Sequence, residues 1–240
     1  MDTVKLDDYG NTLMIAHRGV SGLEKENTAA AFVAAGNRSY IGIETDVHRT
    51  ADGRFVVIHD SKTERVAPAN MRVEESSYEA IRAIRLYDID GSLGRNDLRI
   101  PDLYEYVSIC KKYGKTAVLE LKNHFTEAEF EKIFGIIDGL GYFGKTIFIT
   151  FFDTTILLLK KLRPDAEAQF LVSELGDGEM AFLKENGLDL DVYYKALTKE
   201  RLDECHRAGI RVNVWTVNEK DEAEKLVGWG VDYITSNIIE

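Results

Sequence analysis

The chain lacks the features of an exported or membrane-inserted protein. Its 240 residues contain no run of 18 apolar residues, and no apolar segment follows Met1. We therefore expect a cytoplasmic protein with neither an export signal nor a stable membrane anchor.

Cysteine is also scarce. Only Cys110 and Cys205 occur, and neither has the Cys or His spacing of a zinc site. Each falls in a segment with a helical pattern, which indicates reduced packing residues, and a redox role is the less favoured alternative. This cysteine usage agrees with a cytoplasmic setting.

Positive charge is in deficit. Thirty basic residues stand against 41 acidic residues, which gives a formal net charge of -11. Non-specific binding to nucleic acid or to an anionic membrane needs an excess of Lys and Arg, so we expect neither partner. If the ligand is an anion, local charges inside a site must attract it.

What the chain has is a regular alternation of two patterns. Short apolar runs typical of buried strands are followed by amphipathic runs typical of helices, which predicts a closed parallel barrel. The predicted strands are 13–17, 41–49, 116–122, 147–151, 167–173, 192–195, 211–217 and 233–235. The predicted helices that follow them include 28–37, 127–140, 154–162, 179–186, 198–208 and 219–228. With eight strands and 240 residues, the sequence predicts a single (β/α)8 TIM barrel, one catalytic domain over 1–240.

Two features interrupt the alternation. Ala51-Asp52-Gly53 is a hairpin signal, so the second strand should turn back as 54–58 and bring His59 to the same rim as Glu44. Segment 61–99 contains one helix-like piece, 76–85, and a polar stretch, 88–97. We interpret 61–99 as a small insertion over the barrel mouth, with an ordinary long loop as the alternative.

The end of the chain leaves no room for a helix after the eighth strand. Five residues follow Thr235, so the outer ring of helices should be open there. Two interpretations remain: residues 1–12 cover the gap, or a second copy of the chain covers it in a homodimer.

Three acidic residues stand in strand-like runs. Glu44 and Asp46 are two residues apart and so point to the same side of a strand, about 6 to 7 Å apart. Glu120 stands near the carboxyl end of another apolar run, with Lys122 on the same face. Neighbouring carboxylates repel each other unless a cation is shared, and carboxylate oxygens suit Mg²⁺, Ca²⁺ or Mn²⁺. The alternatives are a solvated strand face for the pair and a simple Glu120 to Lys122 ion pair.

Two histidines and an arginine follow strands that should end at the same rim. His17 and His59 close different apolar runs, and two imidazoles near one metal can serve as the base and the acid of a phosphoryl transfer. Arg18 offers a planar fork of donors for phosphoryl oxygens, although it could instead pair with a carboxylate such as Glu44.

Three further residues are candidates for the site. Asn27 precedes a predicted helix, so it is either the N-cap of that helix or a contact to the site, or both. The alternation of Asn213 and Trp215 turns the indole toward the barrel axis. Phe151 ends its own strand, and core packing is the alternative for both aromatic residues.

The order and spacing of these motifs resemble the glycerophosphodiester phosphodiesterase family. The family pattern H-R-G, E-N-T, E-x-D, D-G and H-D is matched at 17–19, 26–28, 44–46, 52–53 and 59–60. Later blocks also match in order, at 101–105, 119–122, 215–218 and 230–235. The resemblance therefore covers nearly the whole chain.

The resemblance implies a hydrolase of glycerol and lipid metabolism that cleaves a small glycerophosphodiester to glycerol 3-phosphate and an alcohol. It implies one divalent ion, Mg²⁺ or Ca²⁺ with Mn²⁺ as a further candidate, on Glu44, Asp46 and Glu120. Arg18 and Lys122 would contact the phosphate, with Phe151 and Trp215 as an aromatic lining and Asn27 in support. We assign His59 as the base and His17 as the acid. The alternatives are a lysophospholipase D acting on lipid diesters, which the polar stretch 88–97 and the acidic balance disfavour, and a non-catalytic phosphodiester-binding barrel.

Overall fold

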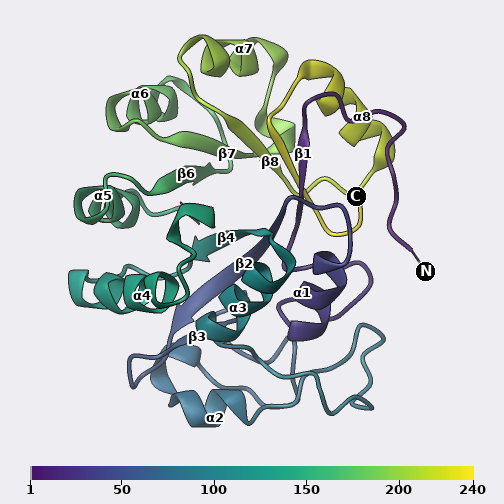
Figure 1. Cartoon of the computed structure of the whole chain (residues 1–240), viewed down its shortest axis with the longest axis vertical. Coiled ribbons are helices and arrows are strands. Elements are labelled where there is room, and N and C mark those ends of the chain that lie inside the picture. The colour runs from purple at the N-terminus through teal and green to yellow at the C-terminus, as the bar shows by residue number, and fades with distance from the viewer. Residues whose placement is uncertain (1) are drawn as a thin grey trace.

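A closed parallel barrel organises the chain. The computed structural model describes residues 2–240. In this part of the chain eight parallel strands close the barrel, and helices surround it (Figure 1). The barrel strands are β1 (Leu13–Ala16), β2 (Gly42–Arg49), β4 (Thr116–Leu121), β5 (Thr146–Thr150), β6 (Glu167–Val172), β7 (Asp189–Tyr193), β8 (Val212–Trp215) and β9 (Tyr233–Ser236). The pairing of β1 with both β2 and β9 closes the ring and confirms the predicted TIM barrel.

The helices begin and end at the signals that the sequence carries. Asp102 and Thr198 cap their helices by accepting a backbone N–H, and Gly114, Gly187 and Gly230 end theirs in the left-handed conformation. The long helices are α1 (Ala29–Gly36), α3 (Leu103–Tyr113), α4 (Glu127–Gly139), α5 (Asp153–Leu162), α6 (Asp177–Asn186), α7 (Lys199–Arg207) and α8 (Lys220–Trp229). Short 3₁₀ turns are η1 (Val73–Glu75), η2 (Phe143–Lys145) and η3 (Tyr194–Ala196).

One predicted strand was displaced along the chain. The prediction placed it at 192–195, whereas β7 runs from Asp189 to Tyr193 and a 3₁₀ turn follows. Leu190 and Val192 are fully buried in the layer between the barrel and its helices, and Asp191 therefore lies on the inner face of the barrel. Asp189 and Asp191 interrupt the apolar run, so the sequence pattern did not indicate where this strand begins.

The predicted hairpin is present and sets the geometry of the mouth. β3 (Phe55–Val57) runs antiparallel to β2, with Val57 opposite Val47. β1 pairs with the beginning of the same edge of β2, where Ala16 lies opposite Ile43. The chain leaving β1 and the chain leaving β3 therefore approach each other along one edge of β2.

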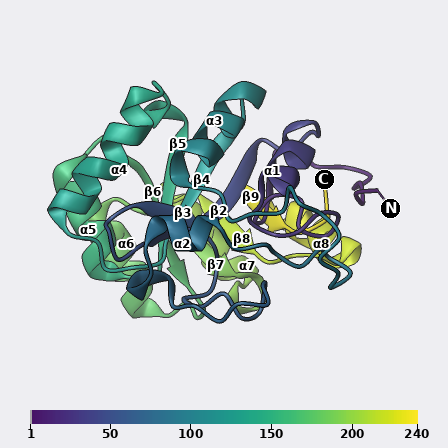
Figure 2. The ribbon, with the colours of Figure 1, turned by 90° about the horizontal axis from the view of Figure 1, so that it is seen from below.

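Segment 61–99 has a small core of its own. Its buried side chains, among them Val66, Val73, Ile81 and Leu98, pack against Val56 of β3. The helix in this segment, α2 (Tyr78–Arg82), is shorter than the predicted 76–85 and lies beside β3 (Figure 2). That the segment acts as an insertion over the mouth of a single catalytic domain remains a prediction.

The first described residues and the C-terminus lie near each other at the open part of the helix ring (Figures 1 and 2). Val4 pairs with Ile239, the Tyr9 hydroxyl donates to the carbonyl of Glu240 (2.5 Å), and Leu6 is buried. Within the described residues, the N-terminal segment thus covers the end of the chain; residue 1 lies outside them. A homodimer remains a prediction.

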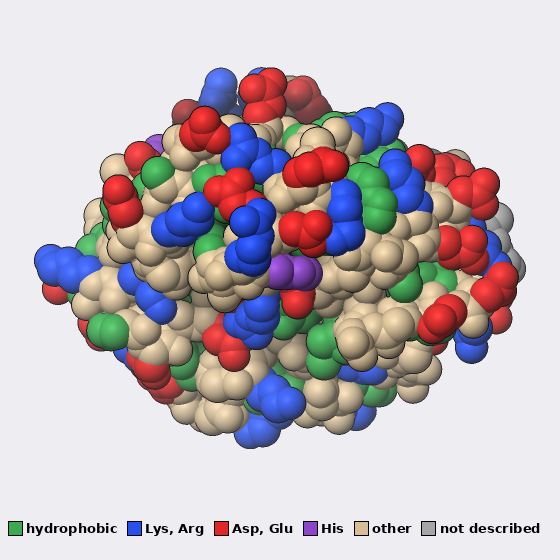
Figure 3. Space-filling view, turned by 90° about the horizontal axis from the view of Figure 1, so that it is seen from above, with side chains coloured by type: hydrophobic (Ala, Val, Ile, Leu, Met, Phe, Trp, Pro, Cys, Tyr) green, Lys and Arg blue, Asp and Glu red, His purple; other side chains and the backbone are tan. Residues whose placement is uncertain are grey.

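The surface shows mixed charge on the side at the top of Figure 1. Basic and acidic side chains are interspersed there, and hydrophobic side chains form only small separate groups (Figure 3). Across residues 2–240, no helix has the length and apolar character needed to cross a membrane.

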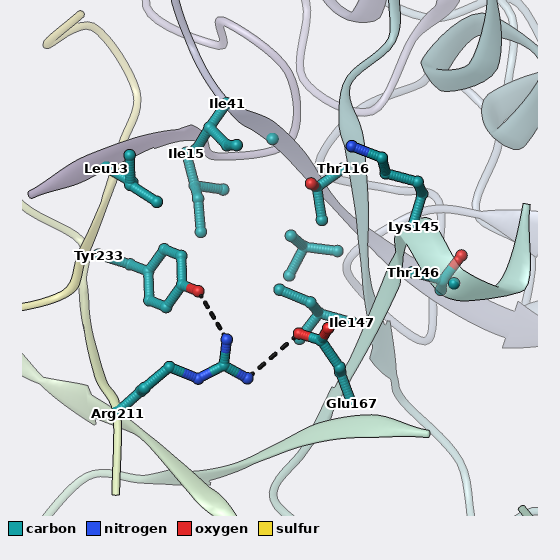
Figure 4. A pocket seen from close by; sticks show the side chains of 13 residues that line it. Leu13, Ile15, Ile41, Thr116, Lys145, Thr146, Ile147, Glu167, Arg211 and Tyr233 are labelled. Atoms are coloured by element: carbon teal, nitrogen blue, oxygen red, sulfur yellow. Dashed lines mark hydrogen bonds and ion pairs between the residues drawn. The ribbon is translucent and has the colours of Figure 1, made fainter. Parts of the chain in front are cut away.

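The amino-terminal end of the barrel contains a cavity of about 210 Å³ (Figure 4). Ile15, Val118 and Ile147 form its apolar wall. On another side Arg211 donates to the Tyr233 hydroxyl (3.1 Å) and to the Glu167 carboxylate (3.1 Å). This mouth is thus lined by apolar side chains and paired charges.

Candidate active site

Three acids meet at the carboxyl-terminal mouth of the barrel. Glu44 and Asp46 project from the inner face of β2, and Glu120 projects from β4 directly opposite Asp46. One carboxylate oxygen from each lies within 4.8 Å of the others, and all three side chains are almost fully buried. The structure therefore brings together the three acids that the sequence singled out.

Two cations compensate this negative charge only in part. Lys122 Nζ lies 2.8 Å from Glu120 Oε1 and 3.5 Å from Asp46 Oδ1. Arg18 Nε lies 3.4 Å from Asp46 Oδ2, but the other arm of its guanidinium donates to Glu26 Oε1 (3.0 Å). Arg18 thus pairs with carboxylates, as the alternative interpretation held, although its partners are Asp46 and Glu26.

The carboxyl groups differ strongly in acidity. Burial, Asp46 and Glu120 raise the pKa of Glu44 well above its ordinary value. Burial and Asp46 raise the pKa of Glu120 to about 7, against the opposing effect of Lys122. Burial also acts to raise the pKa of Asp46, but Arg18 and Lys122 outweigh it and hold that pKa well below its usual range. The local cations therefore suffice to keep one carboxylate charged, and not all three.

The three carboxyl groups fit a divalent ion. They offer only oxygen donors, which hard cations such as Mg²⁺ and Ca²⁺ prefer. Asp46 Oδ1 is buried and accepts no hydrogen bond from any residue in 2–240. A dication among these acids would balance their mutual repulsion and coordinate that oxygen, so the cluster could hold a metal ion.

The loop after β1 has a strained backbone and helps to position the acids. Arg18 and Asn27 both have positive φ, 53° and 54°, which non-glycine residues rarely adopt. Gly19 also has positive φ, and a Cβ there would lie 2.6 Å from the Cβ of Ala31. These constraints let the Arg18 N–H donate to Glu44 Oε2 (2.8 Å), so the loop fixes the carboxylate.

Asn27 is not a helix cap, which corrects one of its two interpretations. Thr28 caps α1, because its hydroxyl accepts from the N–H of Ala31. Asn27 instead donates to Asp46 Oδ2 (2.7 Å) and accepts from the Thr45 hydroxyl (2.7 Å). It orients the carboxylate of Asp46, a contact that depends on its left-handed backbone.

His17 follows β1 and has a neutral partner. Its Nδ1 lies 2.6 Å from Asn237 Oδ1, and its Nε2 lies 3.9 Å from Glu44 Oε2. Since an amide oxygen only accepts, Nδ1 carries the proton and Nε2 faces the acid cluster. Burial and Arg18 lower the pKa of His17 to about 4, so the imidazole is neutral near pH 7.

His59 follows β3 and has a charged partner. Its Nδ1 lies 2.7 Å from Asp60 Oδ1, and Asp60 is itself held by Arg65. Burial lowers the pKa of His59, although Asp46 and Asp60 oppose that effect. The two histidines therefore lie at one mouth but in different electrostatic settings.

A pocket of about 100 Å³ joins these groups to an aromatic wall. Phe151 and Trp215 line it, with ring centroids 5.6 Å apart in an edge-to-face arrangement. The other lining residues include His17, Arg18, Glu44, His59, Glu120, Lys122, Asp191, Thr216 and Thr235. Asn27 and Asp46 are not among its lining residues, although Asp46 pairs with Lys122 and Arg18 of the lining.

Sequence reasoning missed three residues beside the pocket. Tyr193 packs against Trp215 at 5.6 Å, Asn237 binds His17, and Asp191 lies in the pocket wall. The alternation of Asp189, Asp191 and Tyr193 could have indicated the two on β7 had the strand been placed correctly. Nothing in the sequence pattern indicated the partner of His17.

This (β/α)8 barrel brings histidines, acids and basic side chains together at its carboxyl-terminal mouth. That is the architecture of a barrel enzyme that acts on anions. The model of the "Glycerophosphoryl diester phosphodiesterase family" matches residues 17–240. The chain belongs to this family and is thus a phosphoric diester hydrolase, which confirms the resemblance in its motifs.

Relatives are similar over almost their full length. The glycerophosphodiester phosphodiesterase of Caldanaerobacter subterraneus subsp. tengcongensis is 29% identical over 229 residues, 94% of each chain. The crystal structure of a glycerophosphodiester phosphodiesterase from Parabacteroides distasonis is 27% identical, with a TM-score of 0.80 over 95% of this chain and 93% of that one. An Oleispira antarctica phosphodiesterase in complex with the product sn-glycerol-3-phosphate has the same fold, with 24% identity and a TM-score of 0.82 over 94% and 93% of the chains.

Proposed function

We propose that this protein hydrolyses glycerophosphodiesters to glycerol 3-phosphate and an alcohol, with one divalent ion held by Glu44, Asp46 and Glu120. The observation that carries the proposal is the convergence of these buried acids with His17 and His59 at one mouth. The product complex of the Oleispira antarctica enzyme supports a small glycerol phosphate ligand in this fold. Mg²⁺ or Ca²⁺ suits the all-oxygen donor set, with Mn²⁺ as a further candidate.

Substrate binding rests on the two cations of the mouth. Lys122 and Arg18 lie in the pocket wall and donate to the phosphoryl oxygens of the diester. When bound, the divalent ion supplies Lewis-acid stabilisation of the charge that builds on those oxygens. Both cations are pre-positioned by Glu120, Asp46 and Glu26, so little reorganisation accompanies binding.

The histidines divide the proton transfers. His59 takes the proton of the nucleophile through Nε2, because its Nδ1 donates to Asp60, which stabilises the imidazolium that forms. His17 gives its Nε2 proton to the oxygen of the departing alcohol. The nucleophile is either water or the neighbouring glycerol hydroxyl; the second route forms a cyclic phosphate that water then opens.

The low pKa of His17 bears on this assignment. In the free chain His17 is neutral near pH 7, and an acid must carry a second proton. A phosphodiester anion bound beside Nε2 favours the protonated form and so raises the pKa of His17 toward the working range. The assignment thus requires that His17 gain its proton together with the substrate.

A substrate and metal panel tests the function. Protein dialysed against chelator is supplied with Mg²⁺, Ca²⁺ or Mn²⁺, and release of glycerol phosphate is measured from glycerophosphocholine, glycerophosphoethanolamine, glycerophosphoglycerol and lysolipids. We expect turnover of the glycerophosphodiesters only with a metal. Turnover of lysolipids alone would favour the lysophospholipase D alternative, and no turnover of any diester would favour a non-catalytic binding barrel.

A further inference from the structure

A buried acid on β7, Asp191, has no part in the chemistry proposed above. Its side chain lies on the inner face of the barrel, is only 2% exposed, and forms part of the same pocket wall as Glu120 and Trp215. Its Oδ1 accepts no hydrogen bond from any of the residues described. A buried polar atom of this kind normally has a partner, so a bound molecule is expected to supply the donor.

The polar neighbours of Asp191 bond mainly to one another. Asn213 lies opposite Asp191 in the β7–β8 pairing. It donates to Gln169 Oε1 (3.3 Å) and accepts from the Thr235 hydroxyl (3.1 Å). This row of side chains spans the barrel interior and leaves two buried atoms without a hydrogen bond within residues 2–240, Gln169 Nε2 and Asp191 Oδ1.

A second polar atom of the wall is also free. Trp215 Nε1 is buried and has no acceptor within residues 2–240. Edge-to-face packing on Phe151 and contact with Tyr193 fix the indole in place. The pocket that contains Glu44 and Glu120 therefore also offers one unpartnered acceptor and one unpartnered donor, and a hydroxyl group both donates and accepts.

We propose that Asp191 is a specificity residue that accepts a hydrogen bond from a hydroxyl of the glycerol part of the substrate, while the Trp215 N–H donates to an oxygen of the same part. This inference rests on the proposed function. A pocket built to bond a hydroxyl discriminates strongly against an analogue that lacks it, because the buried polar groups are then left unpaired. A quaternary ammonium group would leave the Trp215 N–H without an acceptor, so the hydroxyl is the better match.

The test compares two ligands that differ only in hydroxyl groups. Binding of sn-glycerol 3-phosphate and of propyl phosphate to the Mg²⁺-loaded protein is measured by calorimetry. We expect the wild type to prefer glycerol 3-phosphate by about 10-fold or more. Asp191→Leu should lose this preference, and Asp191→Asn should keep part of it because an amide oxygen still accepts. Asp189→Asn, at the other end of the same strand, is the matched control and should keep it in full.

Several outcomes would overturn the inference. Equal affinity of the wild type for both ligands would do so, as would an Asp191→Leu variant that binds both less tightly with an unchanged ratio, since that marks a structural role. If Asp191→Leu does not fold, Asp191→Asn is used instead. An Asp191→Asn protein that keeps the full wild-type affinity and the full preference for glycerol 3-phosphate over propyl phosphate would also overturn the inference.

The inference and the proposed function can fail separately. Turnover of diesters without any preference for glycerol 3-phosphate over propyl phosphate would reject the role of Asp191 alone. An Asp191-dependent preference in a protein that cleaves no diester would reject the hydrolysis and leave the hydroxyl recognition supported. An Asp191→Leu effect confined to glycerophosphocholine turnover, with glycerophosphoglycerol unaffected, would assign the residue to the choline group and overturn the inference.

Discussion

The two mouths of the barrel differ in how far their acidic side chains are paired with basic ones. At the amino-terminal mouth, Asp189 binds both the backbone N–H and the guanidinium of Arg211, and Glu167 binds the same arginine. At the carboxyl-terminal mouth, Asp46 and Glu120 pair with Lys122, and Asp46 also pairs with one arm of Arg18. The third buried acid, Glu44, accepts from the Arg18 backbone N–H. The amino-terminal cavity is the larger one, about 210 Å³ against about 100 Å³. Cavity size therefore does not mark the site; uncompensated buried charge does.

The arrangement at the carboxyl-terminal mouth lowers the stability of the folded chain, and binding of a cation there would account for it. Asp189 and Glu167 are paired with Arg211, whereas Glu44 and Glu120 are buried in a way that disfavours their charged forms. A fold retains such an arrangement where a ligand of opposite charge restores the balance. The comparison predicts that substitutions at one mouth change activity while substitutions at the other change only stability.

The largest expected effect is loss of either histidine of the carboxyl-terminal mouth. On a natural diester, His17→Ala and His59→Ala should each lower kcat by about 10²- to 10⁴-fold, the usual span for an acid or a base. A nitrophenyl ester of glycerol phosphate separates them, because nitrophenolate departs without a proton. His17→Ala should recover much of its rate on this ester, and His59→Ala should stay slow.

Other outcomes of this experiment carry distinct meanings. Recovery by His59→Ala alone would exchange the two assignments. Equal defects of both variants on both substrates would mean that neither histidine is the acid and that both position the substrate. His206, which pairs with Asp232 on the outer surface, is the matched control, and His206→Ala should keep full activity.

The second effect distinguishes the lysines of the two mouths. Lys122→Met should lower kcat/KM by about 10- to 150-fold, which corresponds to about 1.5 to 3 kcal/mol for a charge-assisted hydrogen bond. Lys145 lies at the amino-terminal cavity, and Lys145→Met should leave kcat/KM unchanged. If Lys122→Met also left kcat/KM unchanged, Lys122 would serve only as the partner of Glu120.

Much of the carboxyl-terminal mouth was predictable from the sequence because its residues sit where apolar strands stop. The spacing of Glu44 and Asp46 places both on one face of β2, and the hairpin at Asp52 returns His59 to the rim. Asp191 escaped prediction because an acid on the inner face of a short strand interrupts the apolar run that marks a strand.

The sequence pattern did not predict contacts that depend on an unusual backbone conformation or on a distant loop. Asn27 looks like a helix cap, and only its left-handed backbone turns the side chain toward Asp46. The pairing of His17 with Asn237 joins residues 220 positions apart, at the ends of β1 and β9. Strand alternation predicts the face of a side chain but not its partner on a loop.

A third prediction concerns the stability of the metal-free protein. The pKa of Glu120 is about 7 in the folded chain against 4.5 as its ordinary value, so the folded chain binds this proton more tightly than the unfolded chain. The stability that this provides is present below about pH 4.5 and is lost as pH rises through 7. Glu120→Gln removes the buried charge and should raise the free energy of unfolding of the metal-free protein by on the order of 2 kcal/mol at pH 8.

Denaturant unfolding in excess chelator measures this effect across the pH range. The gain of Glu120→Gln over the wild type should shrink toward zero as pH falls to about 4.5. A variant less stable than the wild type at pH 8 would show that the ion pair with Lys122 outweighs burial and repulsion. With Mg²⁺ present the order should reverse, because only the wild type offers the full set of carboxylates.

The smallest effect is the counterpart at the amino-terminal mouth, and it should have the opposite sign. Asp189 accepts from the Arg211 N–H (2.8 Å) and from its Nε (2.8 Å), so Asp189→Asn loses an ion pair without relieving any repulsion. Because Arg211 is 43% exposed, water screens the pair, and we expect a loss of only about 1 kcal/mol. The loss should diminish as salt concentration rises, while kcat/KM stays unchanged. An increase in stability like that expected for Glu120→Gln would mean that carboxylates are strained at both mouths, and unbalanced charge would then no longer identify the site.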